Sequence, residues 1–302
     1  MQFIKIAKEL WDEKVNEEKN SNIFHTSWWS DVSARIFNKS ISYYLFINQE
    51  NQYLIPIFFD NEIKESYSIG LIGNGGILPI GHMSITYSEL IKTIASKFSF
   101  FFGSLPTKIM LNIQNNPVVP KSYYYNPKIF KTQVLDITSD IEQVFNFRIS
   151  GNVRTAVRKA KKKDIYIIKE DFNDYEILDA YNLLIKTQTY VGSNYTTPFE
   201  LFENLISTTF SSLYIAKKDD VIVSMTVCLF FKSSAFFYLN GWDREYSPLC
   251  ANQLLIWEMI LDAKNKDCQT FNFGSSHYDS LTKAKSKWGT SDYYTINLER
   301  NI

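Results

Sequence analysis

The stretch from Ala235 to Ser276 constrains the fold most, because it predicts a strand, a loop, a helix and a second strand in succession. Residues 251–265 predict a helix that is apolar around most of its circumference, as expected when a helix lies on a sheet. The turn-rich loop 244–250 leads into that helix, whose first turn carries unpaired backbone N–H groups that can hold a phosphate. A buried αβ crossover without any ligand is the other interpretation.

The second half of the chain predicts a mixed α/β unit. Short turns separate three successive strands, which indicates an antiparallel meander followed by the αβ crossover. The expected helices cover 152–163, 175–190, 198–208, 251–265 and 278–287, and the expected strands cover 165–169, 212–217, 221–231, 235–240, 270–273 and 293–298.

The first half predicts a looser version of the same element order. Its glycine-rich stretch has neither the Gly-Lys-Ser/Thr of a phosphate loop nor the context of a dinucleotide fold, and predicts strand ends, bulges or a close backbone approach. We therefore expect an α/β chain of two tandem domains, 1–136 and 137–302. The expected elements of the first are helices 4–19, 28–37 and 88–98, strands 42–47, 52–59 and 108–113, the glycine-rich stretch 69–81 and a surface connection 115–127.

Charge and cysteine content exclude some classes of function. Lys plus Arg and Asp plus Glu both total 32, so a chain-wide nucleic-acid-binding surface is excluded and no DNA partner is expected. The three cysteines have no paired spacing and the histidines are isolated, which predicts reduced thiols and no metal. The N-terminus lacks a signal-peptide core and no apolar run is long enough to span a membrane, so a cytoplasmic protein is expected.

Five segments share a pattern with one known family. They are the basic helix from Asn152, the loop and helix 241–263, the strand Thr270-Phe-Asn-Phe-Gly-Ser275, the segment Ala284-Lys-Ser-Lys-Trp-Gly289 and, in the first half, Gly73-Asn-Gly-Gly76. Together they resemble the FemAB-like acyltransferases of the GNAT superfamily. Asn272 and Ala284 depart from the family pattern, which has Asp and Phe there, and no long coiled-coil arm is visible.

The resemblance implies two tandem GNAT-type domains, of which the second binds an acyl donor. The implied activity is N-acyl transfer from acetyl-CoA or another acyl-CoA to an amine of a small molecule, an amino sugar or a nucleotide-sugar precursor of the cell envelope. One alternative is a peptidyltransferase that uses aminoacyl-tRNA, and another is a non-catalytic RNA-binding relative. The oligomeric state is left open.

A donor site follows from this implied fold. The pantetheine arm would lie between two splayed strands, which brings in Asn240 and Phe273, and the diphosphate would meet main-chain N–H groups at the helix start. Asn252 is expected either to cap the helix or to touch a phosphate. The predicted main-chain contacts are Leu249, Cys250, Ala251, Asn252 and Gln253.

Candidate catalytic residues come from the same region. Lys285 is expected to stabilise the oxyanion, unless it is only a solvated helix lysine. For the base we consider Asp243, His277 and Asp279, and for protonation of the thiolate Tyr238 and Tyr278.

The acceptor or another phosphorylated partner is expected to meet four further residues. Arg154 and Arg158 stand one turn apart on the basic helix and could together clamp one phosphate; a solvated helix face is the other interpretation. Tyr190 and Ser275 complete the predicted substrate-binding set.

Overall fold

The computed structural model describes residues 2–68, 73, 75–81, 89–92, 108–113, 125–276 and 278–300. The chain divides into two compact units, and the last strand of the chain belongs to the first of them. Unit 1 consists of residues 1–131 and 293–302, and unit 2 of residues 132–292. No described helix is both long and apolar enough to cross a lipid bilayer.

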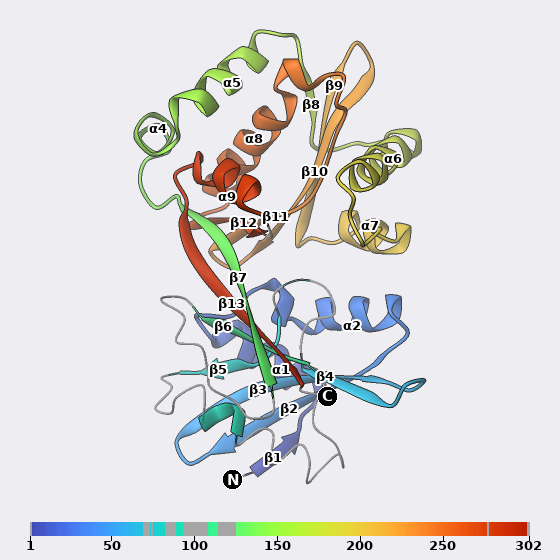
Figure 1. The fold of residues 1–302 in the computed structure, drawn as a ribbon, viewed down its shortest axis with the longest axis vertical. Helices are drawn as coiled ribbons and strands as arrows, with labels where there is room; N and C mark the ends of the chain where they lie inside the picture. Colours follow the sequence, from blue (N-terminus) through green and yellow to red (C-terminus); the bar gives the residue numbers. More distant parts are fainter. Residues whose placement is uncertain are drawn as a thin grey trace. The chain divides into compact units, whose positions relative to one another are not determined.

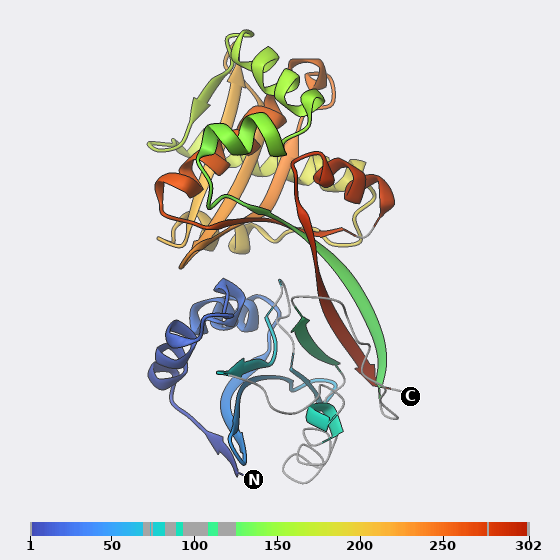
Figure 2. The same ribbon diagram turned by 90° about the vertical axis from the view of Figure 1, so that its left-hand side faces the viewer.

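Unit 1 contains a mixed sheet, and α1 and α2 are among its described helices (Figure 1). Its strands follow one another in the order β1, β2, β3, β4, β6 and β13, with β5 also on β3. Figures 1 and 2 show β13 running beside β7, its other neighbour. The elements are β1 (Gln2–Lys5), α1 (Lys8–Glu17), α2 (Ser27–Ile36), β2 (Ser40–Asn48), β3 (Asn51–Asp60), β4 (Glu65–Ser68), β5 (Leu78–Ile80), β6 (Lys108–Ile113), β7 (Tyr125–Asp136) and β13 (Ser291–Arg300).

The core of unit 1 joins residues from both ends of the chain. Phe46 and Tyr53 of the β2–β3 hairpin, Ile109 of β6, and Ile296 and Leu298 of β13 pack in one buried cluster. Two glycines confirm the close backbone approach expected in the glycine-rich stretch. A Cβ on Gly75 would lie 2.4 Å from the Phe24 oxygen, and one on Gly76 would lie 2.6 Å from the Met110 oxygen.

Unit 2 contains the predicted meander and crossover. The strand order is β7, β12, β11, β10, β9 and β8, and only the β11–β12 pair is described as parallel. The elements are α4 (Ile141–Gln143), the π-helical turn η2 (Val144–Arg148), α5 (Gly151–Lys161), β8 (Tyr166–Ile168), α6 (Asp174–Tyr190), α7 (Phe199–Ile206), β9 (Ser211–Lys218), β10 (Val221–Phe231), β11 (Ser234–Trp242), α8 (Ala251–Asn265), β12 (Thr270–Ser276) and α9 (Asp279–Ser286).

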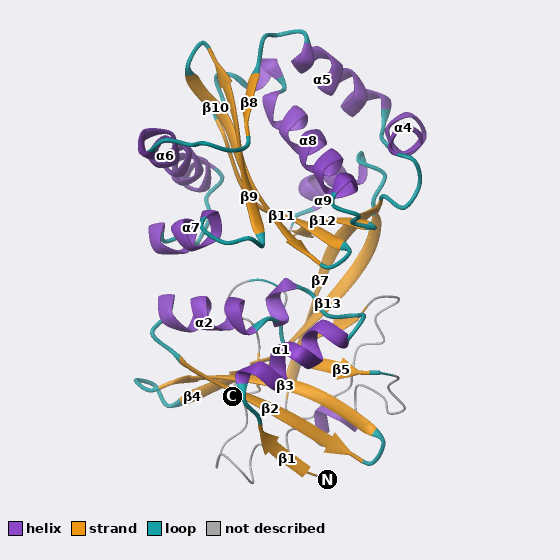
Figure 3. Cartoon of the chain, turned by 180° about the vertical axis from the view of Figure 1, so that it is seen from behind, coloured by secondary structure: helices purple, strands orange, loops and turns teal. Residues whose placement is uncertain are grey.

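Helices cover both faces of the unit 2 sheet. Helices α6 and α7 pack on one face against β9 to β11, whereas α8 packs on the other and is itself covered by α5 (Figure 3). This explains why α8 is apolar nearly all round: Leu255, Met259, Ile260 and Ala263 are fully buried. On the α6 face, Gly241 permits a very close approach, since a Cβ there would lie 2.9 Å from the Leu184 nitrogen.

The N-terminus differs from its prediction. Residues 4–19 were expected to form one helix, but Gln2–Lys5 pair with Tyr44–Ile47 as an edge strand and the helix begins only at Lys8. The hydrogen bonds offered by the free edge of the β2–β3 hairpin override the helical pattern there.

The limits of the units also differ from those expected. Residues 293–298 were expected in the second domain, yet Ile296 pairs with Leu111 of β6, and the described packing divides the chain at 131/132 instead of 136/137. Tyr125, expected in a surface connection, begins β7 and is buried. Most of the expected helix 88–98 and of the connection 115–127 lies outside the described residues, although 89–92 are helical.

Candidate functional site

Strands β11 and β12 part in the middle of the unit 2 sheet. They pair in parallel only from Ser234↔Thr270 to Phe236↔Asn272, whereas β11 continues to Trp242 and β12 to Ser276. Tyr238 is an extra residue in β11, because the pairing with β10 passes from Leu239 directly to Phe237. Such a bulge bends a strand, and the bend directs the rest of β11 away from β12. The predicted splay is therefore present.

A cavity of about 370 Å³ occupies the region where the strands part. Its lining is mainly apolar on the sheet side, where the rings of Phe237 and Phe273 stand 6.2 Å apart, and polar residues lie at its rim. It is lined by Asn152, Val153 and Ala156 of α5, Phe237, Asn240 and Trp242 of β11, Asn252, Gln253 and Ile256 of α8, Phe273 of β12, Leu281, Ala284 and Lys285 of α9, and Lys287 and Trp288.

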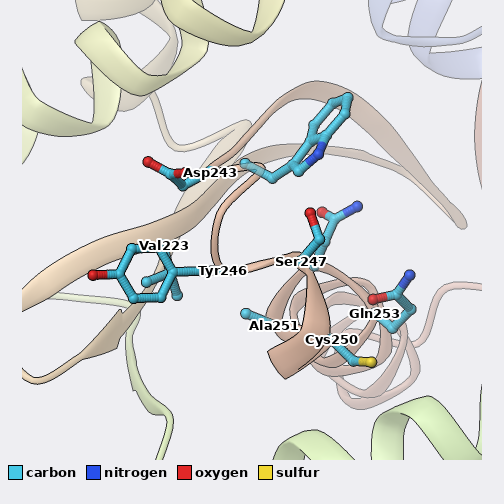
Figure 4. A pocket seen from close by; sticks show the side chains of 9 residues that line it. Val223, Asp243, Tyr246, Ser247, Cys250, Ala251 and Gln253 are labelled. Carbon is cyan, nitrogen blue, oxygen red and sulfur yellow. The ribbon is translucent and has the colours of Figure 1, made fainter.

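A second cavity, of about 300 Å³, lies at the start of α8. In Figure 4, Cys250, Ala251 and Gln253 surround the first turn of the helix, and Tyr246 and Asp243 come from the preceding loop and strand end. Trp242, Asn252 and Gln253 line both cavities, so the two adjoin. Together they connect a helix N-terminus with the gap between two strands.

The main-chain N–H groups at this helix start fall into two sets. Those of Leu249 and Cys250 donate within the preceding turn, to the oxygens of Tyr246 and Ser247, so they are not available to a ligand as predicted. Those of Ala251, Asn252 and Gln253 have no acceptor among the described residues, and no side chain caps the helix. The available donors therefore begin at Ala251, two residues later than the sequence suggested.

The side chain of Asn252 does not cap the helix, contrary to one of the two expectations, whereas its contact with a phosphate stays a prediction. Its Oδ1 accepts from Asn240 Nδ2 at 2.7 Å and lies 3.4 Å from Ser224 Oγ. Asn240 Nδ2 also donates to the Met225 oxygen at 3.1 Å. The predicted residues Asn240 and Asn252 are thus brought together, and they fasten the first turn of α8 to β10 and β11.

Lys285 is buried at the edge of the larger cavity and is not a solvated helix lysine. Its Nζ donates to the oxygens of Gly274 and Ser275 at 3.1 and 2.8 Å. Burial lowers the pKa of Lys285 to about 8. The left-handed Gly274 shapes this turn, and its N–H donates to Asn272 Oδ1 at 2.8 Å. Asn272 thus acts as the acceptor of a tight turn at the position where the family pattern has Asp.

The candidates for acid and base catalysis do not converge. Asp243 forms an ion pair with Lys186 at 2.9 Å, and this partner lowers the pKa of Asp243, which makes it a poor base. Tyr238 lines neither cavity, and burial raises its pKa. Tyr278 and Asp279 are exposed at the start of α9. His277 lies outside the described residues, so its role stays a prediction.

The two arginines of α5 do not form a clamp. Arg154 donates to the oxygen of Asn146, whereas the guanidinium of Arg158 lies over the ring of Phe145 at 5.4 Å. Each is therefore engaged with the preceding helical turn. Tyr190 lies at the exposed end of α6 under the guanidinium of Arg244, and Ser275 contributes its main-chain oxygen to Lys285. Neither side chain lines either of the two cavities described above.

Several lining residues were missed by sequence reasoning. Trp242 stands at the junction of the cavities, and Trp288 packs 5.7 Å from the ring of Phe273. Both lie in the motifs 241–263 and 284–289, whose spacing could have identified them. Gln133 holds this region together through the oxygen of Thr282 and the hydroxyl of Ser276, and no sequence signal marks it. Among the described residues, no group of acidic, cysteine and histidine side chains is placed to bind a metal.

Comparison with known proteins agrees with this geometry. Residues 148–280 match the family model described as acetyltransferase (GNAT) domain. A search of curated proteins found no match. Among solved structures, the crystal structure of FemX has a TM-score of 0.69 at 11% identity, covering 98% of this chain and 97% of that one.

Two further structures cover nearly the whole chain. One is L-PGS from Bacillus licheniformis, with a TM-score of 0.58 at 13% identity, covering 98% of this chain and 92% of that one. The other is a tandem GNAT protein from the clavulanic acid biosynthesis pathway, with a TM-score of 0.54 at 9% identity, covering 99% and 98%. The chain has a GNAT/FemAB-like fold, which confirms the resemblance and the expected mixed α/β class.

Proposed function

We propose that this protein is an N-acyltransferase that takes an acyl group, acetyl being the simplest, from coenzyme A and transfers it to an amine. The GNAT/FemAB-like fold supports acyl transfer in general. The observation that carries the finer proposal is the pair of adjoining cavities, which join the free N–H groups of Ala251, Asn252 and Gln253 to the gap between β11 and β12.

The shape of this site matches the parts of the donor. A diphosphate suits the start of α8, where N–H groups and the helix dipole both favour an anion. A pantetheine arm suits the gap between β11 and β12. The arm is extended like a β-strand, and the unpaired edges of the two strands offer it main-chain hydrogen bonds. Phe237, Phe273 and Ile256 provide apolar contacts for its methylene groups.

Acyl transfer then proceeds by attack of the amine on the thioester carbonyl. A C–N bond forms, the C–S bond breaks, the amine loses a proton and the thiolate gains one. We assign Lys285 to stabilise the negative charge that develops on the carbonyl oxygen, since a buried cation acts more strongly there than in water. The residue that takes the proton of the amine is not assigned. Small molecules and amino sugars or nucleotide sugars of the cell envelope are the proposed acceptors.

Transfer from an aminoacyl-tRNA is the second candidate. The observation that favours it is the basic C-terminal end of α5, where Lys159, Lys161 and Lys162 are exposed, although Lys161 also lies 3.9 Å from Glu258. The basic end and the larger cavity meet on one helix, because Asn152, Val153 and Ala156 of α5 line that cavity.

Titration calorimetry distinguishes the two candidates. Acetyl-CoA, coenzyme A and an aminoacyl-tRNA are each titrated into the full chain, and the thiol released from acetyl-CoA is followed with a panel of amines. The proposal expects saturable binding of acetyl-CoA and amine-dependent thiol release. If neither acetyl-CoA nor coenzyme A binds and the tRNA binds in a salt-sensitive way, the first proposal is wrong and the second candidate is favoured.

A further inference from the structure

The amine of Lys285 meets as many hydrogen-bond acceptors as its uncharged form can use. Its Nζ donates to the main-chain oxygens of Gly274 and Ser275 at 3.1 and 2.8 Å. An ammonium group has three N–H donors, whereas an uncharged amine has two and a lone pair. Both N–H groups of the uncharged form are therefore engaged by the turn between β12 and α9, and the lone pair is left for a group in the cavity.

The surroundings of Lys285 favour this uncharged form. Among the described residues no carboxylate pairs with its Nζ, and none belongs to the lining of the larger cavity. Asp243 lines the smaller cavity, but it is paired with Lys186 at 2.9 Å. The Lys285 side chain is buried, and burial lowers its pKa to about 8. A fraction of the molecules therefore carries the uncharged amine even at neutral pH.

The protein itself offers few nucleophiles to an acyl donor in the larger cavity. Among the described lining residues, only Lys285 and Lys287 have a nucleophilic side chain, since the others are apolar, aromatic or amides. Lys287 is exposed, so water stabilises its ammonium form. Lys285 differs, because the proposed contact with the carbonyl oxygen also brings its Nζ close to the carbonyl carbon. Without an acceptor, Lys285 is thus the buried amine beside the thioester.

We propose that Lys285 is a self-acylation site, whose amine attacks the bound acyl thioester when no acceptor occupies the cavity. A C–N bond forms between Nζ and the acyl carbon, the C–S bond breaks, and the proton lost by the amine goes to the departing thiolate. The inference rests on the proposed function, which supplies the thioester, and goes beyond it by assigning a modification site.

Self-acylation stops acyl transfer. The product is an amide, which carries no positive charge and cannot replace the ammonium group beside a developing oxyanion. An amide is also stable in water, so the modification persists after the donor has left. The site therefore inactivates itself when the donor is abundant and the acceptor is scarce.

The first measurement locates the acyl group. The full chain is incubated with acetyl-CoA without any amine and digested with a protease that does not cut at lysine, and mass spectrometry follows the acetylation of each lysine. Lys285 should be acetylated at least about tenfold faster than Lys283, because only Lys285 is held beside the bound donor. Lys283 is the matched control, since it is exposed on the same helix and lines neither of the two cavities. Excess coenzyme A should slow the acetylation of Lys285 alone.

The second measurement links the modification to activity. The incubated chain is separated from the donor and assayed with fresh acetyl-CoA and an amine, and its turnover should fall in proportion to the acetylated fraction of Lys285. Lys285→Arg is incubated in parallel. Its guanidinium stays charged and is a poor nucleophile, so this variant should keep the turnover that it had before incubation. Unfolding during the incubation would lower the turnover of both chains.

The outcomes are distinguishable because calorimetry measures the binding of acetyl-CoA separately. If acetyl-CoA binds but Lys285 is acetylated no faster than Lys283, self-acylation is overturned and the proposed function stands. Unchanged turnover of the acetylated chain overturns the inactivation. If acetyl-CoA does not bind at all, the self-acylation site and the proposed function both fail.

Discussion

Lys285 Nζ donates to the main-chain oxygen of Ser275 at 2.8 Å, across the turn from β12 into α9. With the second bond to the Gly274 oxygen, this contact holds a lysine that is only 8% exposed at a fixed place on the cavity edge. A third N–H of the ammonium group is not used by these two bonds. The relationship gives the proposed charge stabilisation a rigid support and leads to the first two predictions.

Replacing Lys285 by Met should lower turnover at least about tenfold and leave the affinity for acetyl-CoA nearly unchanged. This is the behaviour of a group that acts only in the transition state. Steady-state kinetics with calorimetric binding measures both quantities. Lys283→Met, at an exposed position of the same helix, is the control and should have normal turnover. Normal turnover in the Lys285 variant removes this residue from the mechanism.

The pH dependence of turnover should follow Lys285. Burial lowers the pKa of this lysine to about 8, so the charged form that stabilises an oxyanion is lost as the pH rises through that value. We therefore expect kcat to fall by up to tenfold per pH unit above about 8. The substitution Lys285→Arg keeps the charge and should shift this decline to higher pH. A rise in kcat through pH 8 contradicts the assignment and indicates a base.

The free energy of unfolding should also depend on the titration of Lys285, but it should rise with pH where kcat falls. Between pH 8 and 10.5 the lysine carries a proton in the unfolded chain but not in the folded one. Stability therefore rises with pH across this window, and Lys285→Met should remove that contribution. Urea unfolding of both chains at pH 7.5, 9 and 10 checks this. A contribution that does not change with pH means that the folded pKa is not lowered.

Gln253→Glu should weaken binding of acetyl-CoA about tenfold or more at low salt. The substitution preserves size and places a negative charge beside the free N–H groups at the start of α8. The effect should decrease at high salt because screening shortens the reach of the charge. Gln143→Glu, an exposed position on α4, is the isosteric control. Equal affinities of the two variants contradict a diphosphate at this helix start.

Two left-handed glycines offer a matched pair for backbone packing. A Cβ on Gly289 would lie 2.6 Å from the Arg148 oxygen, whereas one on Gly192 would meet nothing within 4 Å. Both alanine variants should lose about 1–2 kcal/mol of stability, because alanine is strained in the left-handed backbone conformation. Gly289→Ala should cost at least about 1 kcal/mol more, because it also pushes α9 from the segment before α5. Urea unfolding measures the difference in stability between the two variants. Equal losses of stability would mean that the segment around Arg148 moves away without cost.

The sequence predicted correctly those elements in which the pattern of apolar residues extends along the whole element. The meander and α8 were predicted within about two residues, because alternation and apolar periodicity extended over whole elements there. It was a poor guide to the N-terminus, where the pairing of Phe3 with Phe46 is a contact between distant parts of the chain. It also could not show that Ile296 pairs with Leu111.

Within the site, residue types were easier to predict than their hydrogen bonds. The motifs placed Lys285, Phe273 and Asn240 at one cavity. They could not show that Asn252 turns toward Asn240, because the partner comes from another strand. The sequence could not distinguish the free N–H of Ala251 from the occupied one of Cys250, since the 3-10 turn before α8 decides it. Arg154 and Arg158 have clamp spacing, yet both are engaged by the turn before their helix.

The pairing of β13 with β6 has a consequence for synthesis on the ribosome. Unit 1 obtains Ile296 and Leu298 for its core only after all of unit 2 has been translated. Until β13 is synthesised, β6 lacks its antiparallel partner, and this edge of the unit 1 sheet stays unpaired while some 160 residues of unit 2 are translated. Unit 2 can therefore complete its fold before unit 1 does.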